Sequence, residues 1–371
     1  MITPPPRLNP QPSSAAQGVR AYAPPPRAGF IDLRLDSNER NLDPALVTDL
    51  LSALEPDDLA RYPSAAELES LIAQRLGVEP EQVLVTAGGD EAIERACRAF
   101  LERGRELLTT TPTFEMIARS ARLAGATVRE IPWETGAFPT DAVIDAVSAA
   151  TAMTAVVTPN NPTGAVAGAE DLRRLSAAAS QSLLLVDLAY TEFADEDLTA
   201  AVLALPNALV VRTFSKAWGL AGLRVGFAAG PAQIIHALRA VGGPYTVSAV
   251  SIAAAQRRIA NGADDVAAYA AQVRSERATL SSAIHELGGS ALPSRANFVL
   301  AEFADASWVA DGLASLGIAV RRFSGTPRLS KKLRITCPGS QAELKRLTSS
   351  LRTILEPQAL LFDMDGVLAD V

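Results

Sequence analysis

Histidine and cysteine are scarce in this chain, with two of each among 371 residues. The two histidines, His236 and His285, leave little material for a histidine-based catalytic triad or a histidine-rich metal site. The two cysteines, Cys97 and Cys337, lie far apart without a CxxC or Cys/His spacing, which argues against a zinc site and a disulfide framework. We therefore expect no bound metal and a protein of the reducing cytoplasm.

Long apolar runs and an excess of basic residues are also missing. No uninterrupted stretch reaches 18 apolar residues, and the N-terminus lacks a basic segment followed by an apolar one. Neither a membrane span nor a secretion signal is predicted. The formal net charge of −7 gives no electrostatic footprint for nucleic acid. We expect neither a membrane nor a nucleic acid as a partner.

The apolar content of 48% is enough for a large core, and the length predicts two domains or one large domain with a satellite. Apolar strands and helices alternate through the first two thirds of the chain, which predicts an α/β fold with a mainly parallel, seven-stranded sheet covered by helices. The strands are expected at 82–86, 106–110, 126–130, 154–158, 183–187, 208–213 and 224–229, and the helices between them at 65–76, 90–103, 114–124, 140–149 and 169–180.

After Gly230 the pattern changes to Ala-rich helices and two later strands, which predicts a smaller α+β domain. The helices are expected at 231–241, 246–260 and 263–288, and the strands near 296–302 and 332–336. The resulting division is a disordered Pro-rich arm (1–29), an N-terminal arm joining the small domain (30–50), a large domain (51–245), a small domain (246–356) and a tail (357–371).

Two polar segments follow expected strands. TPNNPTG (158–164) puts Asn160 and Asn161 at the carboxyl end of a strand, where open α/β sheets bind ligands. Asn, Pro and Gly also form ordinary turns, which is the alternative. In VDLAY (186–190), Asp187 ends an apolar strand and Tyr190 follows it. The carboxylate of Asp187 either faces a ligand or caps the next turn.

FSKAWGLAGLR (214–224) carries a lysine among small and apolar residues. Lys216 is either a solvated surface group or an amine placed to form a Schiff base. Ser215 and Arg224 supply a hydroxyl donor and a cation, which suit a phosphate. The glycine spacing here is GxxGxxxG, and the GxGxxG of dinucleotide sites does not occur in the chain.

TAGGDEAI (86–93) follows a strand and opens a helix. Gly88 and Gly89 permit close approach of the backbone, and the free N–H groups of a helix N-terminus suit an anion. Asp90 could instead simply cap this helix.

Together and in this order, TAGGDEA, TPTF, PNNPTG, DLAY, SKAWGLAGLR and KLRIT resemble the fold-type I aminotransferases, most closely the histidinol-phosphate aminotransferases. The resemblance covers roughly residues 30–355 and implies pyridoxal 5'-phosphate as cofactor. It implies transamination of histidinol phosphate plus 2-oxoglutarate to imidazole acetol phosphate plus glutamate, a step of histidine biosynthesis. An aromatic or other amino acid as donor, a phosphothreonine decarboxylase-like lyase reaction, and a cofactor-free binding protein are the alternatives.

The resemblance also implies roles for individual residues. Lys216 would bind the cofactor covalently and then act as general base and acid. Asp187 would pair with the protonated pyridine nitrogen, while Asn161 and Tyr190 would hydrogen-bond the phenolic oxygen of the ring. The remaining cofactor contacts are implied at Ser215, Arg224, Gly89 and Asp90 for the phosphate and at Phe114 for stacking on the ring.

Assembly and substrate binding are implied by further matches. Tyr62, in RYPS, matches a tyrosine that reaches the cofactor phosphate of the neighbouring subunit, which implies a homodimer with shared active sites. Arg334, in KLRIT, and Arg321, in IAVRRF, match arginines that bind the acid group of a substrate, and a solvated strand end is the alternative for Arg321 and Arg322. Asn38 fits the substrate-side loop, although the chain reads NERN at 38–41 where relatives read NENP.

The tail carries a second resemblance. FDMDGVLAD (362–370) is similar to the first motif of haloacid dehalogenase-like phosphatases, with Asp363 in the nucleophile position and Asp365 in the acid position. The rest of that fold and its magnesium ligands are missing from the sequence, so we expect no phosphatase activity. The motif is interpreted as a truncated or separated fusion, with a coincidental strand and turn as the alternative.

Overall fold

The computed structural model describes residues 12–17, 19, 30–52, 54–323 and 326–357. Within the predicted arm at 1–29, it describes one short helix, α1 (Ser14–Gln17), which contacts α6. The phosphatase-like motif with Asp363 and Asp365 lies outside the described residues. None of the helices in the described ranges combines the length and the apolar character needed to cross a membrane.

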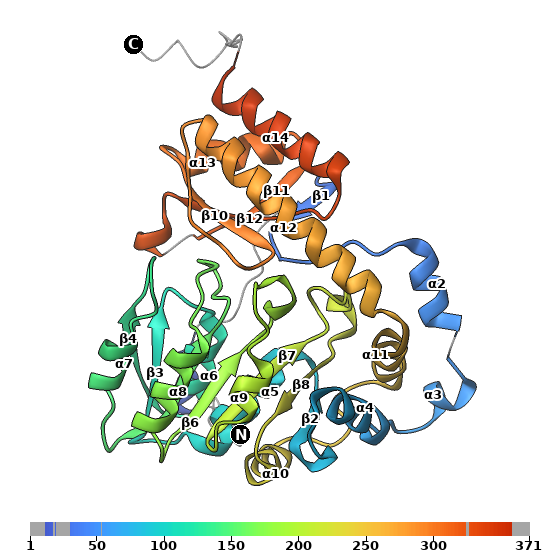
Figure 1. The fold of residues 1–371 in the computed structure, drawn as a ribbon, viewed down its shortest axis with the longest axis vertical. Coiled ribbons are helices and arrows are strands. Elements are labelled where there is room, and N and C mark those ends of the chain that lie inside the picture. Colours follow the sequence, from blue (N-terminus) through green and yellow to red (C-terminus); the bar gives the residue numbers. More distant parts are fainter. Residues whose placement is uncertain (1–11, 18, 20–29, 53, 324–325, 358–371) are drawn as a thin grey trace, which may run out of the picture.

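A seven-stranded sheet forms the centre of the larger part of the fold (Figure 1). Its strand order is β2-β8-β7-β6-β5-β3-β4, and only β8 runs antiparallel to its neighbours. The predicted mainly parallel sheet is confirmed. Its strands are β2 (Val83–Thr86), β3 (Glu106–Thr111), β4 (Thr127–Pro132), β5 (Thr151–Val157), β6 (Leu183–Asp187), β7 (Ala208–Thr213) and β8 (Gly226–Ala229).

Helices cover both faces of this sheet because its central strands are apolar on both sides. Every residue of β5 and β6 is buried. Along β6, Leu184 and Val186 belong to one apolar cluster while Leu183 and Leu185 belong to another, as the alternation of a strand requires. The helices are α4 (Ala66–Leu76), α5 (Gly88–Phe100), α6 (Glu115–Leu123), α7 (Thr140–Asp145), α8 (Ala169–Ala178), α9 (Thr199–Leu203) and α10 (Ala232–Val241).

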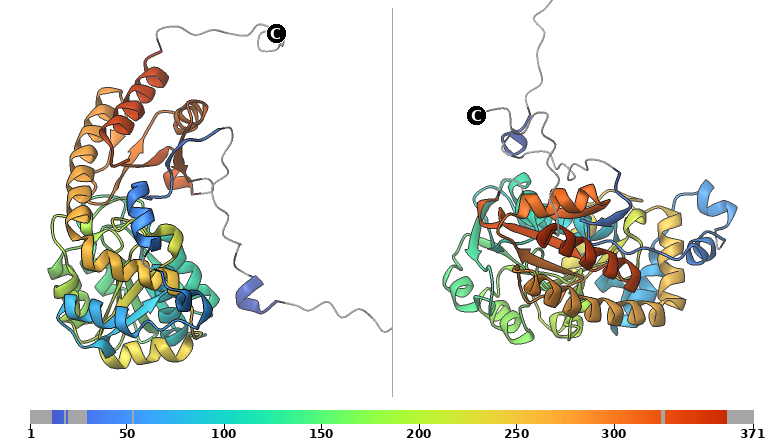
Figure 2. Two further views of the ribbon diagram at one scale, coloured as in Figure 1. Left: turned by 90° about the vertical axis from the view of Figure 1, so that its right-hand side faces the viewer. Right: turned by 90° about the horizontal axis from the view of Figure 1, so that it is seen from above.

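A second sheet of five strands lies above the first in Figure 1, with the order β1-β11-β12-β10-β9. Its first strand comes from the start of the chain and pairs in parallel with β11. Figure 2, seen from above, shows this blue segment beside the orange and red elements. The strands are β1 (Leu33–Leu35), β9 (Ser290–Ala291), β10 (Phe298–Glu302), β11 (Ile318–Arg322) and β12 (Lys332–Thr336).

The helices of the later chain are α11 (Ala249–Asn261), α12 (Ala263–Glu286), α13 (Ala306–Ser315) and α14 (Gln341–Leu355). α13 and α14 pack against each other, and α12 contacts α14 and β10. α11 packs against α4 and against two short helices of the N-terminal segment, α2 (Pro44–Ser52) and α3 (Pro56–Ala60). The expected domain boundary near residue 245 stays a prediction.

Candidate active site

Three predicted site residues follow neighbouring parallel strands. Asn161 lies just after β5, Asp187 is the last residue of β6, and Lys216 lies just after β7. The chain runs outward from β3 to β4 and then returns to β5 on the other side of β3, so the direction of strand order reverses here. Open α/β sheets bind ligands at the carboxyl ends of strands near such a reversal. The fold therefore brings these side chains to the edge where a ligand is expected.

The amine of Lys216 lies partly buried against the N-terminal segment. Its Nζ donates a hydrogen bond to the backbone oxygen of Ser37 at 3.0 Å and lies 5.9 Å from the centre of the Tyr190 ring. Burial, together with the positive charge of Arg334, lowers the pKa of Lys216 to about 8. A larger fraction of the amine is therefore neutral and nucleophilic near neutral pH than in an ordinary lysine.

Asp187 is a buried carboxyl with little to neutralise it. One oxygen accepts a hydrogen bond from the backbone N–H of Ala189 at 3.0 Å, as the turn-capping alternative expected. Within the described ranges Asp187 forms no ion pair, and burial raises its pKa to about 7. A cationic N–H donor at this position would stabilise the charged carboxylate.

Tyr190 is held from the small sheet by Asn38. The Nδ2 of Asn38 donates to the hydroxyl of Tyr190 at 2.9 Å. Thr336, on β12, accepts from the backbone N–H of Asn38 at 3.2 Å and donates to its Oδ1 at 3.0 Å. Asn38 is only 1% exposed and its amide bonds to Tyr190, while its expected place on the substrate side stays a prediction.

The two asparagines of TPNNPTG have different environments. Asn160 is fully buried and bonds to Pro112 and Thr163 through Nδ2 at 2.9 Å each, and its Oδ1 accepts from Thr113 at 2.6 Å. It therefore holds the turn together. Asn161 instead accepts a hydrogen bond from Arg334 through its Oδ1, at 2.6 Å.

Arg334, on β12, connects three separate parts of the chain. Besides the bond to Asn161, its Nη2 donates to the backbone oxygen of Asp36 at 2.7 Å, and its guanidinium lies 5.3 Å from the centre of the Phe298 ring. The side chain is thus fixed with its positive charge close enough to lower the pKa of Lys216.

A cradle of small and cationic groups lies at the start of α5. Gly88 has a φ of 78°, and a Cβ there would come within 2.8 Å of Arg224 Nη2. Arg224 in turn donates from Nη1 to Ser215 Oγ at 3.4 Å. The adjacent Gly89 is the second residue of the 13-residue helix α5, in the first turn, whose N–H groups have no acceptor within a helix. The helix N-terminus, a hydroxyl and a guanidinium together suit a phosphate.

Asp90 is drawn to this cradle and does not cap the helix. The N-cap residue of α5 is Ala87, whose own side chain forms no capping hydrogen bond, and its backbone N–H donates to Glu91 Oε2 at 2.5 Å. Asp90 pairs with Arg224 instead, with 2.9 Å between Oδ2 and Nη2 and about half of each side chain exposed. The expected alternative for Asp90 is not observed.

The two predicted aromatic contacts of the cofactor, Phe114 and Tyr62, lie in different environments. Phe114 is the N-cap residue of α6 and packs, partly buried, against the apolar cluster under that helix. Tyr62 is 82% exposed and stacks on Tyr245, with 4.7 Å between ring centres and 18° between planes. Within the described residues, no hydrogen bond or ion pair joins Tyr62 to the groups around Lys216.

Arg321 lies directly opposite Arg334. The two residues are partners in the antiparallel pairing of β11 with β12 and therefore share one face of the sheet. Arg321 is mostly buried, and its Nη2 lies 3.8 Å from Glu115 Oε1 on α6. Arg322 pairs with Asp311 of α13. The solvated-strand-end alternative fits Arg322 better than Arg321.

Sequence reasoning missed the contributions of the N-terminal segment. Ser37 contacts Lys216 through a backbone oxygen, which no side-chain pattern can reveal. Thr336 carries no motif that would connect it with Asn38. Arg40 was visible only as a departure in NERN, yet its Nη1 donates to the backbone oxygen of Ala217, next to Lys216, at 2.8 Å.

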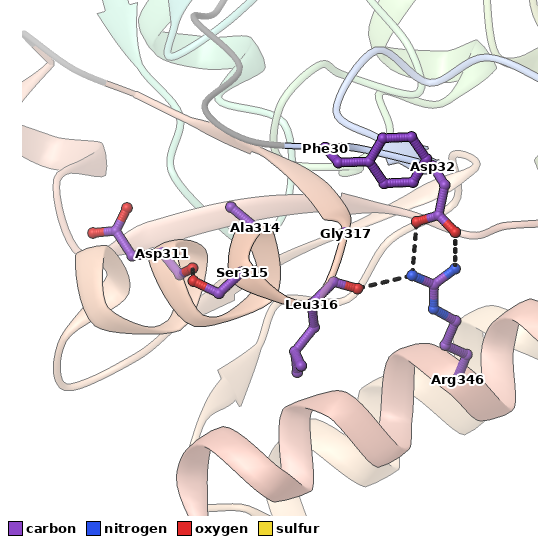
Figure 3. Close-up of a pocket in the computed structure, with 8 residues that line it drawn as sticks. All are labelled: Phe30, Asp32, Asp311, Ala314, Ser315, Leu316, Gly317 and Arg346. Atoms are coloured by element: carbon purple, nitrogen blue, oxygen red, sulfur yellow. Dashed lines mark hydrogen bonds and ion pairs between the residues drawn. The ribbon is translucent and has the colours of Figure 1, made fainter. Parts of the chain in front are cut away.

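Two cavities lie elsewhere on the molecule. One of about 620 Å³ lies between the start of β1 and the end of α13, and none of the predicted site residues lines it (Figure 3). At its rim Asp32 and Arg346 form a two-bonded ion pair with distances of 2.7 and 2.9 Å. A second cavity of about 470 Å³ lies between the N-terminal segment and the glycines that follow Lys216, with Arg40 and Gly219 among its lining residues.

The chain is similar to known proteins over most of its length. The family described as aminotransferase class I and II matches residues 31–351. A histidinol-phosphate aminotransferase of Paracoccus denitrificans is 35% identical and covers 85% of this chain and 87% of its own. One of Dinoroseobacter shibae is 36% identical and covers 82% and 86%. The crystal structure of histidinol-phosphate aminotransferase from Sinorhizobium meliloti in complex with pyridoxal-5'-phosphate has a TM-score of 0.83 at 23% identity, covering 95% of this chain and all of its own.

Proposed function

This chain belongs to the aminotransferase class I and II family, and we propose that it is a pyridoxal phosphate-dependent enzyme converting histidinol phosphate plus 2-oxoglutarate to imidazole acetol phosphate plus glutamate. The observation that carries the proposal is the meeting of Lys216, with its lowered pKa, and the buried, unpaired Asp187 at one edge of the sheet. The two relatives named above, which cover 85% and 82% of this chain, are histidinol-phosphate aminotransferases.

The residues present fit this cofactor. Asp187 lacks a cation, and the protonated ring nitrogen of pyridoxal phosphate would supply one. Gly88 leaves room beside Arg224, and the N-terminus of α5 offers N–H groups for the phosphate. When bound, the cofactor supplies an electron sink for the negative charge that develops on the substrate carbon.

The side chains around the cofactor would then have separate roles. Lys216 would hold the cofactor and, once released, take the proton from the substrate carbon and return it to the cofactor side. Tyr190 and Asn161 would orient the phenolic oxygen, and Asn38 would hold Tyr190 in place through its hydrogen bond. Ser215 and Arg224 would bind the phosphate.

The arginine pair supports an anionic substrate. Like charges directly opposite each other on a sheet repel. An anion bound between Arg321 and Arg334 would offset this repulsion and so would be bound favourably. The phosphate of histidinol phosphate and a carboxylate of 2-oxoglutarate would use this pair in turn. An aromatic amino acid donor would need only one of the two guanidinium groups.

Assembly and location belong to the same proposal. A homodimer with shared active sites would give the exposed Tyr62 a further partner, because among the described residues its one ring contact is Tyr245. A cytoplasmic location agrees with the biosynthetic function of the named relatives.

The proposal is tested by the visible absorption of the bound cofactor. Protein purified with pyridoxal phosphate should be coloured, the colour should be lost in Lys216→Ala, and it should remain in Lys345→Ala, a control at an exposed position of α14. Single-turnover spectra with histidinol phosphate, phenylalanine and phosphothreonine then identify the substrate. A colourless wild-type protein contradicts the enzyme assignment, and a faster reaction with phenylalanine contradicts the substrate assignment.

A further inference from the structure

Two arginines from distant parts of the chain hold the loop that follows Lys216. Arg40, in the N-terminal segment, donates from Nη1 to the backbone oxygen of Ala217 at 2.8 Å. Arg258, on α11, donates from Nε to the backbone oxygen of Trp218 at 3.1 Å. These oxygens belong to the first two residues after Lys216 and lie outside any helix or strand.

One carboxylate joins the two arginines. Asp265, in the first turn of α12, accepts from Arg40 at 2.6 Å through Oδ1 and from Arg258 at 2.7 Å through Oδ2. The side chains of Arg40 and Arg258 are 9% and 2% exposed, so both guanidinium groups need a nearby negative charge. Burial acts to raise the pKa of Asp265, but its bonds to the two arginines outweigh this and leave the pKa lowered.

We propose that Arg40, Asp265 and Arg258 are positioning residues that fix the backbone beside Lys216, so that its amine is held ready for the cofactor. The proposal rests on the proposed function of Lys216. We call these three side chains the arginine clamp. Charge-assisted hydrogen bonds to backbone oxygens are strong and directional, and two of them on successive residues leave the loop little freedom.

The N-terminal segment reinforces the clamp from the other side. Ser37, three residues before Arg40, accepts the hydrogen bond from the Lys216 amine. A Cβ on Gly219 would come within 2.3 Å of the side chain of Leu42, which shows how closely the segment lies on the loop. The same short stretch of chain therefore touches both the amine of Lys216 and the backbone that carries it.

The clamp also accounts for a departure noted in the sequence. The stretch NERN at 38–41 carries an arginine in the third position, and Arg40 uses that position to reach both Asp265 and the loop. Its guanidinium further lies 4.2 Å from the centre of the Tyr269 ring on α12. The substitution gives this chain a direct connection between its N-terminal segment and the loop of Lys216.

Asp265→Asn tests the clamp because it removes the shared charge with almost no change in volume. Hydrogen exchange of the backbone amides at 214–220 should become faster than in the wild type, measured by mass spectrometry with and without pyridoxal phosphate. The kcat for histidinol phosphate should fall about tenfold, since small displacements of a reacting group are costly. The KM should stay within about twofold, because substrate contacts are unchanged.

Arg257→Met is the matched control. Arg257 is the neighbour of Arg258 on α11 and forms a two-bonded ion pair with Asp49 at 2.6 and 3.0 Å. In the described part of the chain it forms no hydrogen bond or ion pair with the loop. This variant should leave loop exchange and kcat unchanged. Arg40→Met should act like Asp265→Asn, and Arg40→Lys should recover part of the loss because it keeps the charge.

The outcomes separate the clamp from the proposed function. If exchange at 214–220 in Asp265→Asn and Arg40→Met equals that of the wild type or of Arg257→Met, the clamp is wrong, even when the enzyme is active. Faster exchange throughout the molecule also overturns it. If the wild type binds no cofactor, the proposed function fails, while exchange of the cofactor-free loop still decides whether the clamp fixes it.

Discussion

At the scale of residues, the site contains two ionisable groups whose pKa values are both shifted toward the neutral form. Burial raises the pKa of Asp187 to about 7, and burial together with Arg334 lowers the pKa of Lys216 to about 8. Opposite shifts of an acid and a base in one site indicate groups prepared for a ligand that brings its own charge. In the proposed cofactor, the protonated ring nitrogen would supply the positive charge that stabilises the Asp187 carboxylate. Its aldehyde would react with the neutral amine of Lys216.

The pKa of Lys216 gives a direct prediction of its reactivity. Only the neutral amine reacts with acetic anhydride, and a lowered pKa makes the neutral form abundant at lower pH. In cofactor-free protein, labelling of Lys216 should therefore rise with pH and level off with a midpoint at about 8. An ordinary lysine would continue to gain reactivity up to about pH 10.4. Competitive labelling followed by peptide mass spectrometry measures this, with the exposed Lys345 as the reference within the same sample.

If Lys216 follows the same pH curve as the reference, the geometry around its amine is not as described. Among the described residues, the amine of Lys216 has one hydrogen-bond acceptor, the backbone oxygen of Ser37. Loss of that contact would expose the amine and return its pKa toward the ordinary value.

The position of a side chain at the edge of the sheet could be predicted from sequence where it lies at or near the end of a strand. Asp187 is the last residue of β6 and Lys216 lies three residues after β7, so both are expected at the carboxyl edge where ligands bind. The separate environments of Asn160 and Asn161 could not, because adjacent amides in one turn look alike in sequence. The hydrogen bond from Asn38 to Tyr190 joins residues 152 positions apart, so no local sequence pattern could predict it.

At the scale of elements, the pairing of β11 with β12 places the two arginines that we propose for binding the anionic substrate. It aligns Arg321 with Arg334, while the alternation along β11 sends Arg322 to the other side, where Asp311 neutralises it. The sequence predicted β12 but not β11, because Ile318–Arg322 has only three apolar residues before two arginines. Its stabilising neighbour, β1, comes from the opposite end of the chain.

Arg321→Leu should raise the KM for histidinol phosphate roughly 10- to 100-fold, as expected for the loss of a charge-assisted hydrogen bond of about 1.5–3 kcal/mol. The KM for phenylalanine should change much less, because that substrate lacks the phosphate. Steady-state kinetics with both donors measure the difference. Arg322→Leu is the control on the same strand and should leave both values near those of the wild type.

An equal rise for both donors in Arg321→Leu would assign Arg321 to the common carboxylate site and leave the phosphate without a specific partner. Thermal unfolding offers a second check on the pairing. Because two like charges face each other across β11 and β12, the cofactor-free Arg321→Leu protein should be at least as stable as the wild type.

At the scale of the whole molecule, the site exists only where the two sheets and the N-terminal segment meet. Arg334 of the small sheet bonds to Asn161 of the large one, and Ser37 accepts from Lys216. Contacts of this kind join distant residues and depend on how the sheets are placed, so composition and periodicity cannot predict them. The exposed stack of Tyr62 on Tyr245 is the part of the molecule on which the proposed homodimer can be tested.

The proposed sharing of sites between subunits can be tested by mixing two inactive proteins. Lys216→Ala lacks the amine, and Tyr62→Ala should retain little cofactor at limiting pyridoxal phosphate. If Tyr62 serves the neighbouring subunit, a hybrid dimer has one site with both lesions and one intact site. Refolded or co-expressed mixtures should then recover about a quarter of wild-type activity, because half of the dimers are hybrids and half of their sites are intact.

If Tyr62 acts only within its own chain, every site in the hybrid keeps one lesion and no activity returns. Tyr245→Ala in place of Tyr62→Ala separates the two rings, since only the ring that reaches across the interface can be complemented by Lys216→Ala.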